Sequence, residues 1–422
     1  MKTAVILAAG EGKRLRPLTF TRPKCMIELA GKPILAHVLD NLKKAGIKET
    51  VLVVKYMSDV VREYFGDGKK FGMKIEYVEQ GERYGTAAAF ETAREHIDDS
   101  FLGIAADIIT DAEAIKSVIK AHDGIATLGL KNVEHVSEYG IATLKAGKVS
   151  NFEEKPKTSA SKLANASIYA FDSKVFDEIS KLKPSPRGEY EITDVIKNLI
   201  PKREASGVEI SGYWLDMGMP WHLFDANKYL IEKTPAKKGA IENSTISGKV
   251  IMEEGARIYD SYIEGPLYLG KKSEIGPHAY IRGCTSIGDF CHIGDSTTVK
   301  NSIIFHGVNA KHLSYIGDSI VGSNCNFGAG TQIANYRFDE GMITAKISGA
   351  EMDTRRRKLG AVIGDKTKTG VLSCIMPGKT IGDECWIGAG VVVKDNIPRK
   401  TGVFVKQDLV FFNREQKKGE SV

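Results

Sequence analysis

Short apolar segments alternate with segments of helical period through the first half of the chain. The apolar segments predict buried strands and lie at 3–7, 50–54, 73–78 and 101–106. The helical segments lie at 33–45, 58–65 and 86–97, the first with Pro33 in its first turn and Gly46 after its end. This alternation predicts an α/β sheet with ligands beyond the carboxyl ends of its strands.

A six-residue period replaces this alternation in the second half. The apolar residues that repeat it form three runs: Ile263, Leu269, Ile275, Ile281, Ile287, Ile293 and Val299; Tyr315, Val321, Phe327 and Ile333; and Ile375, Ile381, Ile387 and Val393. This is the hexapeptide repeat of a parallel β-helix, in which apolar residues fill the axis of a three-sided coil. Such coils are left-handed, so the prediction depends on the repeat and not on the right-handed crossover rule.

The predicted fold class is therefore α/β, with a Rossmann-like, doubly wound mixed sheet followed by a left-handed parallel β-helix of hexapeptide repeats. We expect an α/β domain at 1–228, a linker helix at 229–239, the coil at 240–412 and a polar, frayed tail at 413–422. A chain of 422 residues is long enough for two or three such domains.

Two segments interrupt the six-residue period. The first spans 305–315, and the second runs from Asn335 to about Gly360. Functional loops emerge where solenoid repeats break, so we expect functional residues in both segments.

Charge and cysteine content narrow the function classes. The net charge of +6 comes from scattered lysines and arginines with one cluster at 355–358, and without an aromatic-interleaved basic stripe we expect no nucleic-acid partner. The six cysteines form no CxxC pair, and the N-terminus has no signal-peptide pattern. No apolar segment approaches the roughly 20 residues that span a bilayer. We therefore expect a soluble, cytoplasmic protein with no membrane partner.

A glycine-rich loop follows the first predicted strand. Gly10 and Gly12 let backbone N–H groups surround an anion, while Arg14 and Lys24 add positive charge. The alternative is an ordinary tight turn, but a GxGxR sequence followed ten residues later by Lys24 favours phosphate binding.

The sequence Leu-Ala-Ala-Gly-x-Gly-x-Arg, with the later Pro23-Lys24, resembles the signature of the sugar-1-phosphate nucleotidyltransferases. Lys13 stands where family members usually have Thr. The resemblance implies that Arg14 and Lys24 are catalytic. It also implies that Gln80 and the turn at Gly85 recognise the base, with Thr86 capping the next helix so that backbone amides face the nucleotide. The alternative is helix capping with no role in nucleotide binding. The implied nucleotide-binding residues are Leu7, Ala8, Ala9, Gly10, Gly12, Gln80, Gly85 and Thr86.

Two aspartates are the candidate metal ligands. Asp107 follows a buried strand, where an unpaired carboxylate is costly, and Asp216 lies in a Trp-x-Asp-x-Gly sequence that resembles a box of the same family. Both could instead be turn residues. The resemblance implies that they hold Mg²⁺, which prefers hard oxygen ligands. Ala106 stands where family members usually have Gly.

The resemblance also implies a sugar-phosphate site and a reaction. Its residues are Gly140, which leaves room for the sugar, Glu153 and Asn165, which bind hydroxyl or acetamido groups, and Lys155, which neutralises the phosphate; a charged hairpin followed by a strand is the alternative. A sugar 1-phosphate attacks the α-phosphorus of a nucleoside triphosphate and expels pyrophosphate. Positioning and charge neutralisation by Mg²⁺, Arg14 and Lys24 carry the rate.

The coil resembles the acetyltransferase half of the bifunctional N-acetylglucosamine-1-phosphate uridylyltransferase/glucosamine-1-phosphate acetyltransferase family. The resemblance implies that His312 is the base that deprotonates the sugar amine as it attacks acetyl-CoA; a solvated surface histidine is the alternative. The other implied residues that bind the amino sugar or acetyl-CoA are Arg282, Lys300, Tyr315, Asn326, Asn335, Tyr336, Lys358 and Ala389. The long second interruption departs from the family and leaves Lys346 and Lys358 as alternatives. The cluster at 355–358 is either a solvated charge run or lies near the phosphates of coenzyme A.

The first hypothesis is a bifunctional enzyme of UDP-N-acetylglucosamine synthesis that uses acetyl-CoA and UTP or dTTP and forms a homotrimer through the coil. The alternative is a single-activity glucose-1-phosphate or mannose-1-phosphate nucleotidyltransferase whose coil only assembles subunits. The sequences at 16–19 and 154–156 resemble those of the glucose-1-phosphate enzymes and favour this alternative. The residues that favour the first hypothesis are His312, Tyr315, Asn326 and Asn335. A non-catalytic subunit is disfavoured because Arg14, Lys24, Asp107 and Asp216 are all present.

Overall fold

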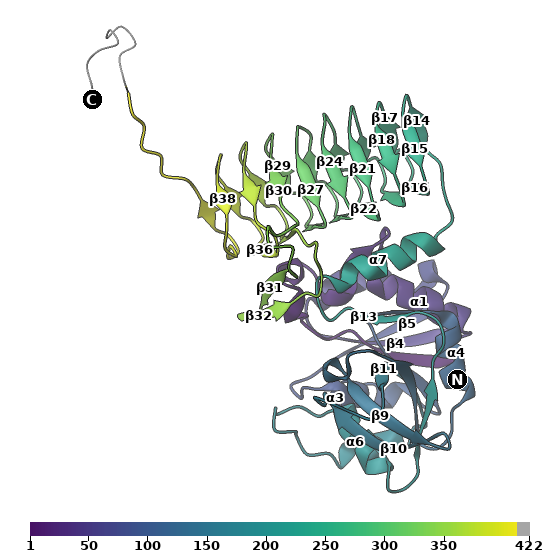
Figure 1. Ribbon diagram of the computed structural model, residues 1–422. Coiled ribbons are helices and arrows are strands. Elements are labelled where there is room, and N and C mark those ends of the chain that lie inside the picture. The colour runs from purple at the N-terminus through teal and green to yellow at the C-terminus, as the bar shows by residue number, and fades with distance from the viewer. Residues whose placement is uncertain (412–422) are drawn as a thin grey trace, which may run out of the picture.

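The computed structural model describes residues 1–411, so the predicted tail at 413–422 and the last residue of the predicted coil lie outside the described residues. An α/β domain is followed by a long three-sided coil, which lies across it (Figure 1). The prediction of a doubly wound mixed sheet followed by a parallel β-helix is confirmed. Within the described residues, no helix is long and apolar enough to cross a membrane.

The α/β domain contains a nine-stranded sheet in the order β5-β4-β1-β6-β11-β8-β12-β10-β9. Its strands are β1 (Thr3–Leu7), β4 (Glu49–Val54), β5 (Lys74–Glu79), β6 (Phe101–Ala105), β8 (Ala126–Asn132), β9 (Gly140–Lys145), β10 (Lys148–Glu154), β11 (Leu163–Phe171) and β12 (Ala205–Glu209). The first four strands in chain order pair in parallel, whereas β11 runs antiparallel to β6 and makes the sheet mixed. Two short pairs, β2 (Glu28–Leu29) with β3 (Lys32–Pro33) and β7 (Ile108–Thr110) with β13 (Trp214–Asp216), flank the sheet.

Seven α-helices accompany the strands of the described chain. They are α1 (Ile34–Lys44), α2 (Ser58–Phe65), α3 (Thr86–Glu91), α4 (Ala112–Lys120), α5 (Val175–Ser180), α6 (Ile192–Leu199) and α7 (His222–Lys233). The helix expected at 86–97 ends as α3 at Glu91 and is followed by a separate 3-10 turn at Arg94–His96. The last helix begins at His222, earlier than the predicted Tyr229, and lies between the sheet and the coil (Figure 1).

Three parallel sheets form the sides of the coil. The nine-stranded coil sheet contains β14 (Ala240–Glu242), β17 (Arg257–Tyr259), β20 (Glu274–Ile275), β23 (His292–Ile293), β26 (Asn309–Ala310), β29 (Asn326–Phe327), β34 (Lys368–Thr369), β37 (Trp386–Ile387) and β39 (Gly402–Val403). The eight-stranded coil sheet contains β15 (Thr245–Ser247), β18 (Tyr262–Glu264), β21 (Tyr280–Arg282), β24 (Thr298–Lys300), β27 (Tyr315–Gly317), β30 (Gln332–Ile333), β35 (Cys374–Ile375) and β38 (Val392–Val393). The seven-stranded coil sheet contains β16 (Val250–Met252), β19 (Leu267–Leu269), β22 (Thr285–Ile287), β25 (Ile303–Ile304), β28 (Ile320–Val321), β33 (Ala361–Ile363) and β36 (Lys379–Ile381).

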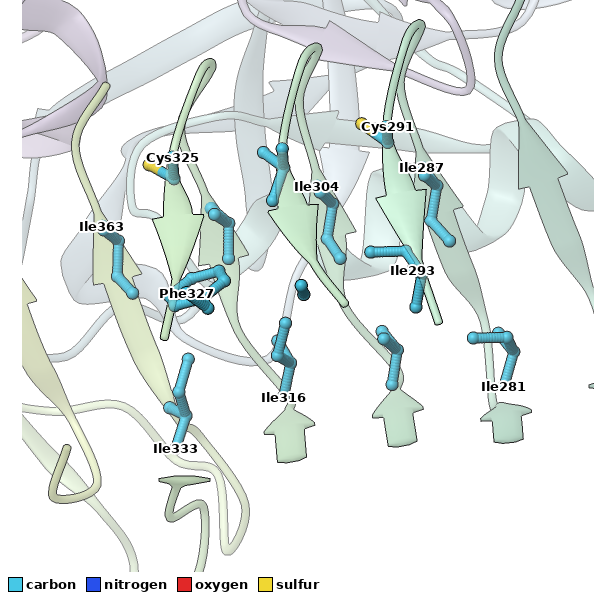
Figure 2. Packing of buried hydrophobic residues seen from close by; sticks show 14 of the residues in the cluster. Ile281, Ile287, Cys291, Ile293, Ile304, Ile316, Cys325, Phe327, Ile333 and Ile363 are labelled. Carbon is cyan, nitrogen blue, oxygen red and sulfur yellow. The ribbon is translucent and has the colours of Figure 1, made fainter. Parts of the chain in front are cut away.

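Apolar side chains from all three sides meet along the axis of the coil (Figure 2). The predicted six-residue rows are buried there, with one exception. Ile316 is fully buried in the axis and pairs with Val299, whereas the predicted Tyr315 faces outward. Because the turn between Val299 and Ile316 is one residue shorter than the turn before it, the inward-facing position moves by one residue.

The predicted first interruption at 305–315 is wrong. This segment forms a regular turn of the coil, in which β26 pairs with β23 and β29. The second interruption is real, because Ile333 pairs with Ile375 across a much longer segment. Part of this segment forms a hairpin of β31 (Thr344–Ile347) and β32 (Ala350–Asp353), which projects from the coil towards the α/β domain (Figure 1). Residues 336–360 are called the insertion below.

One buried apolar cluster spans both domains. It joins Leu15 and Leu18 of the glycine-rich segment to Tyr268 of the coil and Ile343 of the insertion. Tyr268 reaches Gly31, where a Cβ would lie 1.9 Å from the Tyr268 hydroxyl oxygen. Polar contacts add to the interface, including the ion pair of Arg22 with Asp365, and the pair of His306 with Glu28 at 3.3 Å. The two domains therefore form one packed unit.

His37 on α1 is expected to make the stability of the protein fall in mild acid. Burial lowers the pKa of its imidazole to about 4, and Nε2 lies 2.9 Å from the carbonyl oxygen of Leu29. Between pH 6.5 and about 4, His37 binds a proton in the unfolded chain, where its pKa has the ordinary value of about 6.5, but stays neutral in the folded protein. The free energy of unfolding should fall by about 2–3 kcal/mol as pH drops from 6.5 through about 4. Urea unfolding across this range measures it, and His37→Gln should remove this part of the pH dependence.

Candidate functional site

The two candidate metal ligands meet at the carboxyl end of the parallel strands. Asp107 follows β6, and the next strand, β7, pairs antiparallel with β13, so that Asp216 lies opposite Ile108. The Met217 N–H donates to the Asp107 carbonyl oxygen at 3.0 Å, which fixes this arrangement. The β7–β13 pair thus places side by side two carboxylates that are far apart in the sequence.

Lys24 lies between these two carboxylates. Its ammonium forms an ion pair with Asp107 and lies 3.7 Å from an Asp216 oxygen. Burial opposes the charge of Lys24, but the attraction of the two carboxylates is stronger and raises the pKa of its ammonium. Burial and the nearby Asp107 raise the pKa of the Asp216 carboxyl. The cluster is therefore a half-buried, charged centre that can accept a further cation beside its two carboxylates.

The glycine-rich loop is held against Lys24. Gly12 has φ of 67°, and a Cβ there would lie 2.8 Å from the Lys24 Cβ. The Thr19 hydroxyl donates to the Gly12 carbonyl oxygen at 3.0 Å. Gly10 differs, because no described atom lies within 4 Å of the position its Cβ would take. Gly12 is required by the fold, whereas the space above Gly10 is open for a ligand.

Gly12→Ala is expected to destabilise the protein and displace Lys24. The left-handed backbone and the close Lys24 side chain should together lower the free energy of unfolding by about 1–3 kcal/mol. Gly10→Ala is the matched control and should leave stability nearly unchanged, because its methyl group meets open space. Thermal unfolding of both variants measures the difference, and equal destabilisation would contradict this account of the loop.

The predicted base-recognition turn is fixed by Tyr190. A Cβ on Gly85 would lie 2.2 Å from the Tyr190 carbonyl oxygen, and the Gln80 amide donates to the Arg83 carbonyl oxygen at 3.0 Å. Thr86 does not cap α3 as predicted: its hydroxyl oxygen accepts the N–H of Ile192 at 2.9 Å. The Thr86 side chain therefore links the start of α3 to the start of α6.

The predicted sugar-phosphate residues lie on strands β9, β10 and β11 and on the residue after β10. A Cβ on Gly140 would lie 2.6 Å from the Phe152 ring, so the packing of Phe152 accounts for a glycine at this position. Glu153 accepts a hydrogen bond from the Ser159 hydroxyl at 3.0 Å, and the Asn165 amide donates to the Tyr169 hydroxyl at 2.7 Å.

Lys155 lines a cleft of about 640 Å³ together with Arg14 and Asp216. Residues 352–356 of the insertion form another part of its wall. The first two residues of the charge cluster make ion pairs with the α/β domain, Arg355 with Glu138 and Arg356 with Asp225. The length of the second interruption was the sequence signal that pointed to a functional segment here, but it did not indicate this contact.

A second polar cluster lies on the eight-stranded coil sheet and the corner that follows it. Asp318 accepts hydrogen bonds from Lys300 at 3.3 Å and from the Asn335 amide. Asn335 also donates to the Tyr315 hydroxyl at 3.1 Å. Arg282 on β21 lies opposite Lys300 on the neighbouring strand β24, so it adds a further cation next to the cluster. The structure thus brings together four of the predicted acetyl-transfer residues, and Asp318 is a member that the sequence analysis missed.

The other predicted acetyl-transfer residues lie elsewhere on the chain. His312 is half-exposed at the edge between the nine-stranded and eight-stranded coil sheets, with Nδ1 3.0 Å from an Asp295 oxygen. Ala389 is exposed at a later turn of the same edge, and Asn326 lies on the nine-stranded sheet. Lys358 lies on the insertion with its ammonium 5.8 Å from the centre of the Tyr336 ring, and Lys346 lies on β31.

Comparison with protein families matches both parts of the chain. A family model described as nucleotidyl transferase matches residues 3–233, and one described as GMPPB C-terminal domain matches residues 263–371. A solved structure from Bacillus anthracis, assigned as a glucose-1-phosphate thymidylyltransferase in complex with sucrose, is 32% identical with a TM-score of 0.50. The match covers 56% of this chain and 97% of that one.

Curated relatives match the whole chain. Bifunctional protein GlmU from Methanocaldococcus jannaschii is 42% identical over 97% of this chain and 98% of its own. A bifunctional sugar-1-phosphate nucleotidylyltransferase/acetyltransferase from Sulfurisphaera tokodaii is 39% identical over 93% of this chain and 98% of its own. The chain therefore belongs to the family of bifunctional sugar-1-phosphate nucleotidylyltransferases/acetyltransferases.

Proposed function

We propose that the coil acetylates an amino-sugar 1-phosphate with acetyl-CoA and that the α/β domain transfers a nucleotidyl group from UTP or dTTP to the resulting sugar 1-phosphate. The product is UDP-N-acetylglucosamine or a close relative, and pyrophosphate is released. The observation that carries the proposal is the centre of Asp107, Asp216 and Lys24 beside the glycine-rich loop. This centre would bind the polyphosphate, and the same chain carries a separate polar cluster on the coil for the acetyl transfer.

In the nucleotidyl-transfer site, backbone N–H groups near Gly10 and the charges of Arg14 and Lys24 would hold the triphosphate. Asp107 and Asp216 fit a Mg²⁺ ion, because they offer hard oxygens and Lys24 lies closer to Asp107 than to Asp216, 3.7 Å from the Asp216 oxygen. Bound Mg²⁺ would neutralise charge on the phosphates. Lys155 faces the same cleft and would bind the acceptor phosphate.

In the acetyl-transfer site, His312 would take the proton that the sugar amine loses as it attacks the thioester carbon. The Asp295 carboxylate is placed to accept the Nδ1 hydrogen, which leaves Nε2 as the basic nitrogen. Lys300, Tyr315 and Asn335 would orient the amino sugar through the polar cluster on the neighbouring face.

A homotrimer is part of this proposal. Large apolar side chains remain exposed near the edge that carries His312, including Leu313 at 62%, Leu372 at 68% and Trp386 at 60%. An exposed apolar edge of this extent is typical of an interface, and neighbouring coils packed around it would surround His312. The proposal also places the protein in the cytoplasm, because its six cysteines are free.

A panel of sugar 1-phosphates and triphosphates tests the function. Pyrophosphate release and coenzyme A release are measured separately, with and without Mg²⁺. We expect coenzyme A release with an amino-sugar 1-phosphate, and Mg²⁺-dependent pyrophosphate release with its acetylated form. If no amino-sugar phosphate releases coenzyme A, the single-activity hexose-1-phosphate nucleotidyltransferase takes its place.

A further inference from the structure

The insertion belongs to the coil in sequence but is packed on the α/β domain. Ile343, Ala345 and Ile347 are buried in the apolar cluster that contains Leu15 and Trp221. The Thr354 hydroxyl is buried and donates to the Ile343 carbonyl oxygen at 2.6 Å, which closes the base of the hairpin. Because apolar burial and this buried hydrogen bond hold the insertion in place, residues 352–356 form a fixed wall of the cleft beside Asp216.

Two neighbouring arginines of the insertion differ in their surroundings. Arg356 pairs with Asp225 and lies 5.4 Å from the centre of the Phe224 ring, and its side chain is 23% exposed. Arg355 is 50% exposed, lines the cleft and contacts Glu138 at 2.7 Å. Both arginines line the cleft, but Arg356 also fastens the insertion to α7, whereas the Arg355 side chain is the more exposed of the two.

The cleft suits a phosphate group. Arg14 and Lys155 line one part of it, and the insertion adds Arg355 and Arg356. Arg356 is neutralised by its pair with Asp225, which leaves Arg355 as the more exposed cation of the insertion. A guanidinium binds phosphate through two parallel hydrogen bonds, and the exposed pair with Glu138 is weak enough to be exchanged for such a ligand. Asp216, which belongs to the proposed metal centre, lines the same cleft, so a phosphate held there lies beside the reacting groups.

We infer that the insertion completes the nucleotidyl-transfer site and that Arg355 binds a substrate phosphate group in the cleft between the domains. This inference rests on the proposed nucleotidyl transfer. The phosphate belongs either to the sugar 1-phosphate or to the triphosphate, and the two sources are separated by the substrate whose KM changes.

Four single variants test the inference in the full-length protein. Arg355→Ala removes the cation, Arg355→Lys keeps its charge, and Glu138→Gln removes the competing carboxylate. Arg357→Ala is the matched control, because Arg357 is an exposed neighbour that is not part of the cleft wall among the described residues. Initial rates of pyrophosphate release are measured while the sugar 1-phosphate and the triphosphate are varied in turn, and coenzyme A release is measured in parallel.

We expect Arg355→Ala to raise the KM of one of the two substrates about tenfold and to leave kcat unchanged. This increase corresponds to the loss of one charge-assisted hydrogen bond. Arg355→Lys should restore part of this loss, and Glu138→Gln should lower the same KM. Arg357→Ala should match the wild type, and coenzyme A release should be unaffected in all four variants.

A merely structural ion pair gives a different pattern. Arg355→Ala and Glu138→Gln would then shift KM in the same direction, and this result overturns the inference, as does equal behaviour of Arg355→Ala and Arg357→Ala. If the wild type releases no pyrophosphate from any substrate pair, the proposed function itself fails, and this outcome is distinct from failure of the Arg355 assignment.

Discussion

Replacing Asp107 with alanine is expected to abolish pyrophosphate release and to leave coenzyme A release intact. The change removes a proposed metal ligand and the carboxylate that forms an ion pair with Lys24. Charge stabilisation of the leaving pyrophosphate is the main source of rate in this chemistry, and its loss should lower kcat by about 10³-fold or more. Pyrophosphate and coenzyme A are assayed on the same enzyme preparation.

The control for Asp107 is Asp123→Ala, which removes an exposed carboxylate that pairs with Lys148 on the surface of the same domain. It should retain both activities. Asp107→Asn keeps the size of the side chain and should still lose most pyrophosphate release, because a neutral amide replaces the anionic oxygen. Full activity of Asp107→Ala, or loss of both activities together, would contradict separate sites with Asp107 in the nucleotidyl-transfer centre.

Replacing His312 with alanine is expected to give the opposite result. Coenzyme A release should fall by about 10²–10⁴-fold, the usual contribution of a general base, while pyrophosphate release continues with acetylated substrate. Asp295→Asn should reduce coenzyme A release less, because it removes the partner of Nδ1 and leaves the imidazole in place.

His292→Ala is the matched control for His312, because both histidines line one depression of about 240 Å³ on the coil. His292 lies 4.0 Å from Glu274 and has no proposed role in proton transfer. Its loss should spare coenzyme A release. If the His292 variant loses as much activity as the His312 variant, general damage to this part of the coil explains both results.

Most of the fold follows from the sequence because its periods are regular. Ser58–Phe65 begins and ends as predicted, and the buried rows from Ile263 to Val299 lie in the coil axis. The error at Tyr315 has a simple cause: a coil turn one residue shorter shifts the inward-facing position to Ile316. The same shortened turn looked like an interruption at 305–315, although the strand pairing continues through it.

The candidate site was less accessible to sequence reasoning. Asp107 and Asp216 each stood out, but the pairing of β7 with β13 that joins them is a tertiary contact without a local signal. Thr86 and Gly140 were assigned to ligand contacts, whereas Ile192 and Phe152 explain their structural environment. The position of Arg355 depends on the burial of Ile343 against residues more than three hundred positions earlier in the chain.

The contact of Tyr268 with Gly31 has a consequence for domain grafting. The aromatic ring enters a space that exists only because position 31 has no side chain. A chimera that combines this α/β domain with a coil from a relative must therefore carry a compatible pair at these two positions. A side chain at position 31 would thus require a smaller residue at position 268, so the two halves are not interchangeable without attention to this pair.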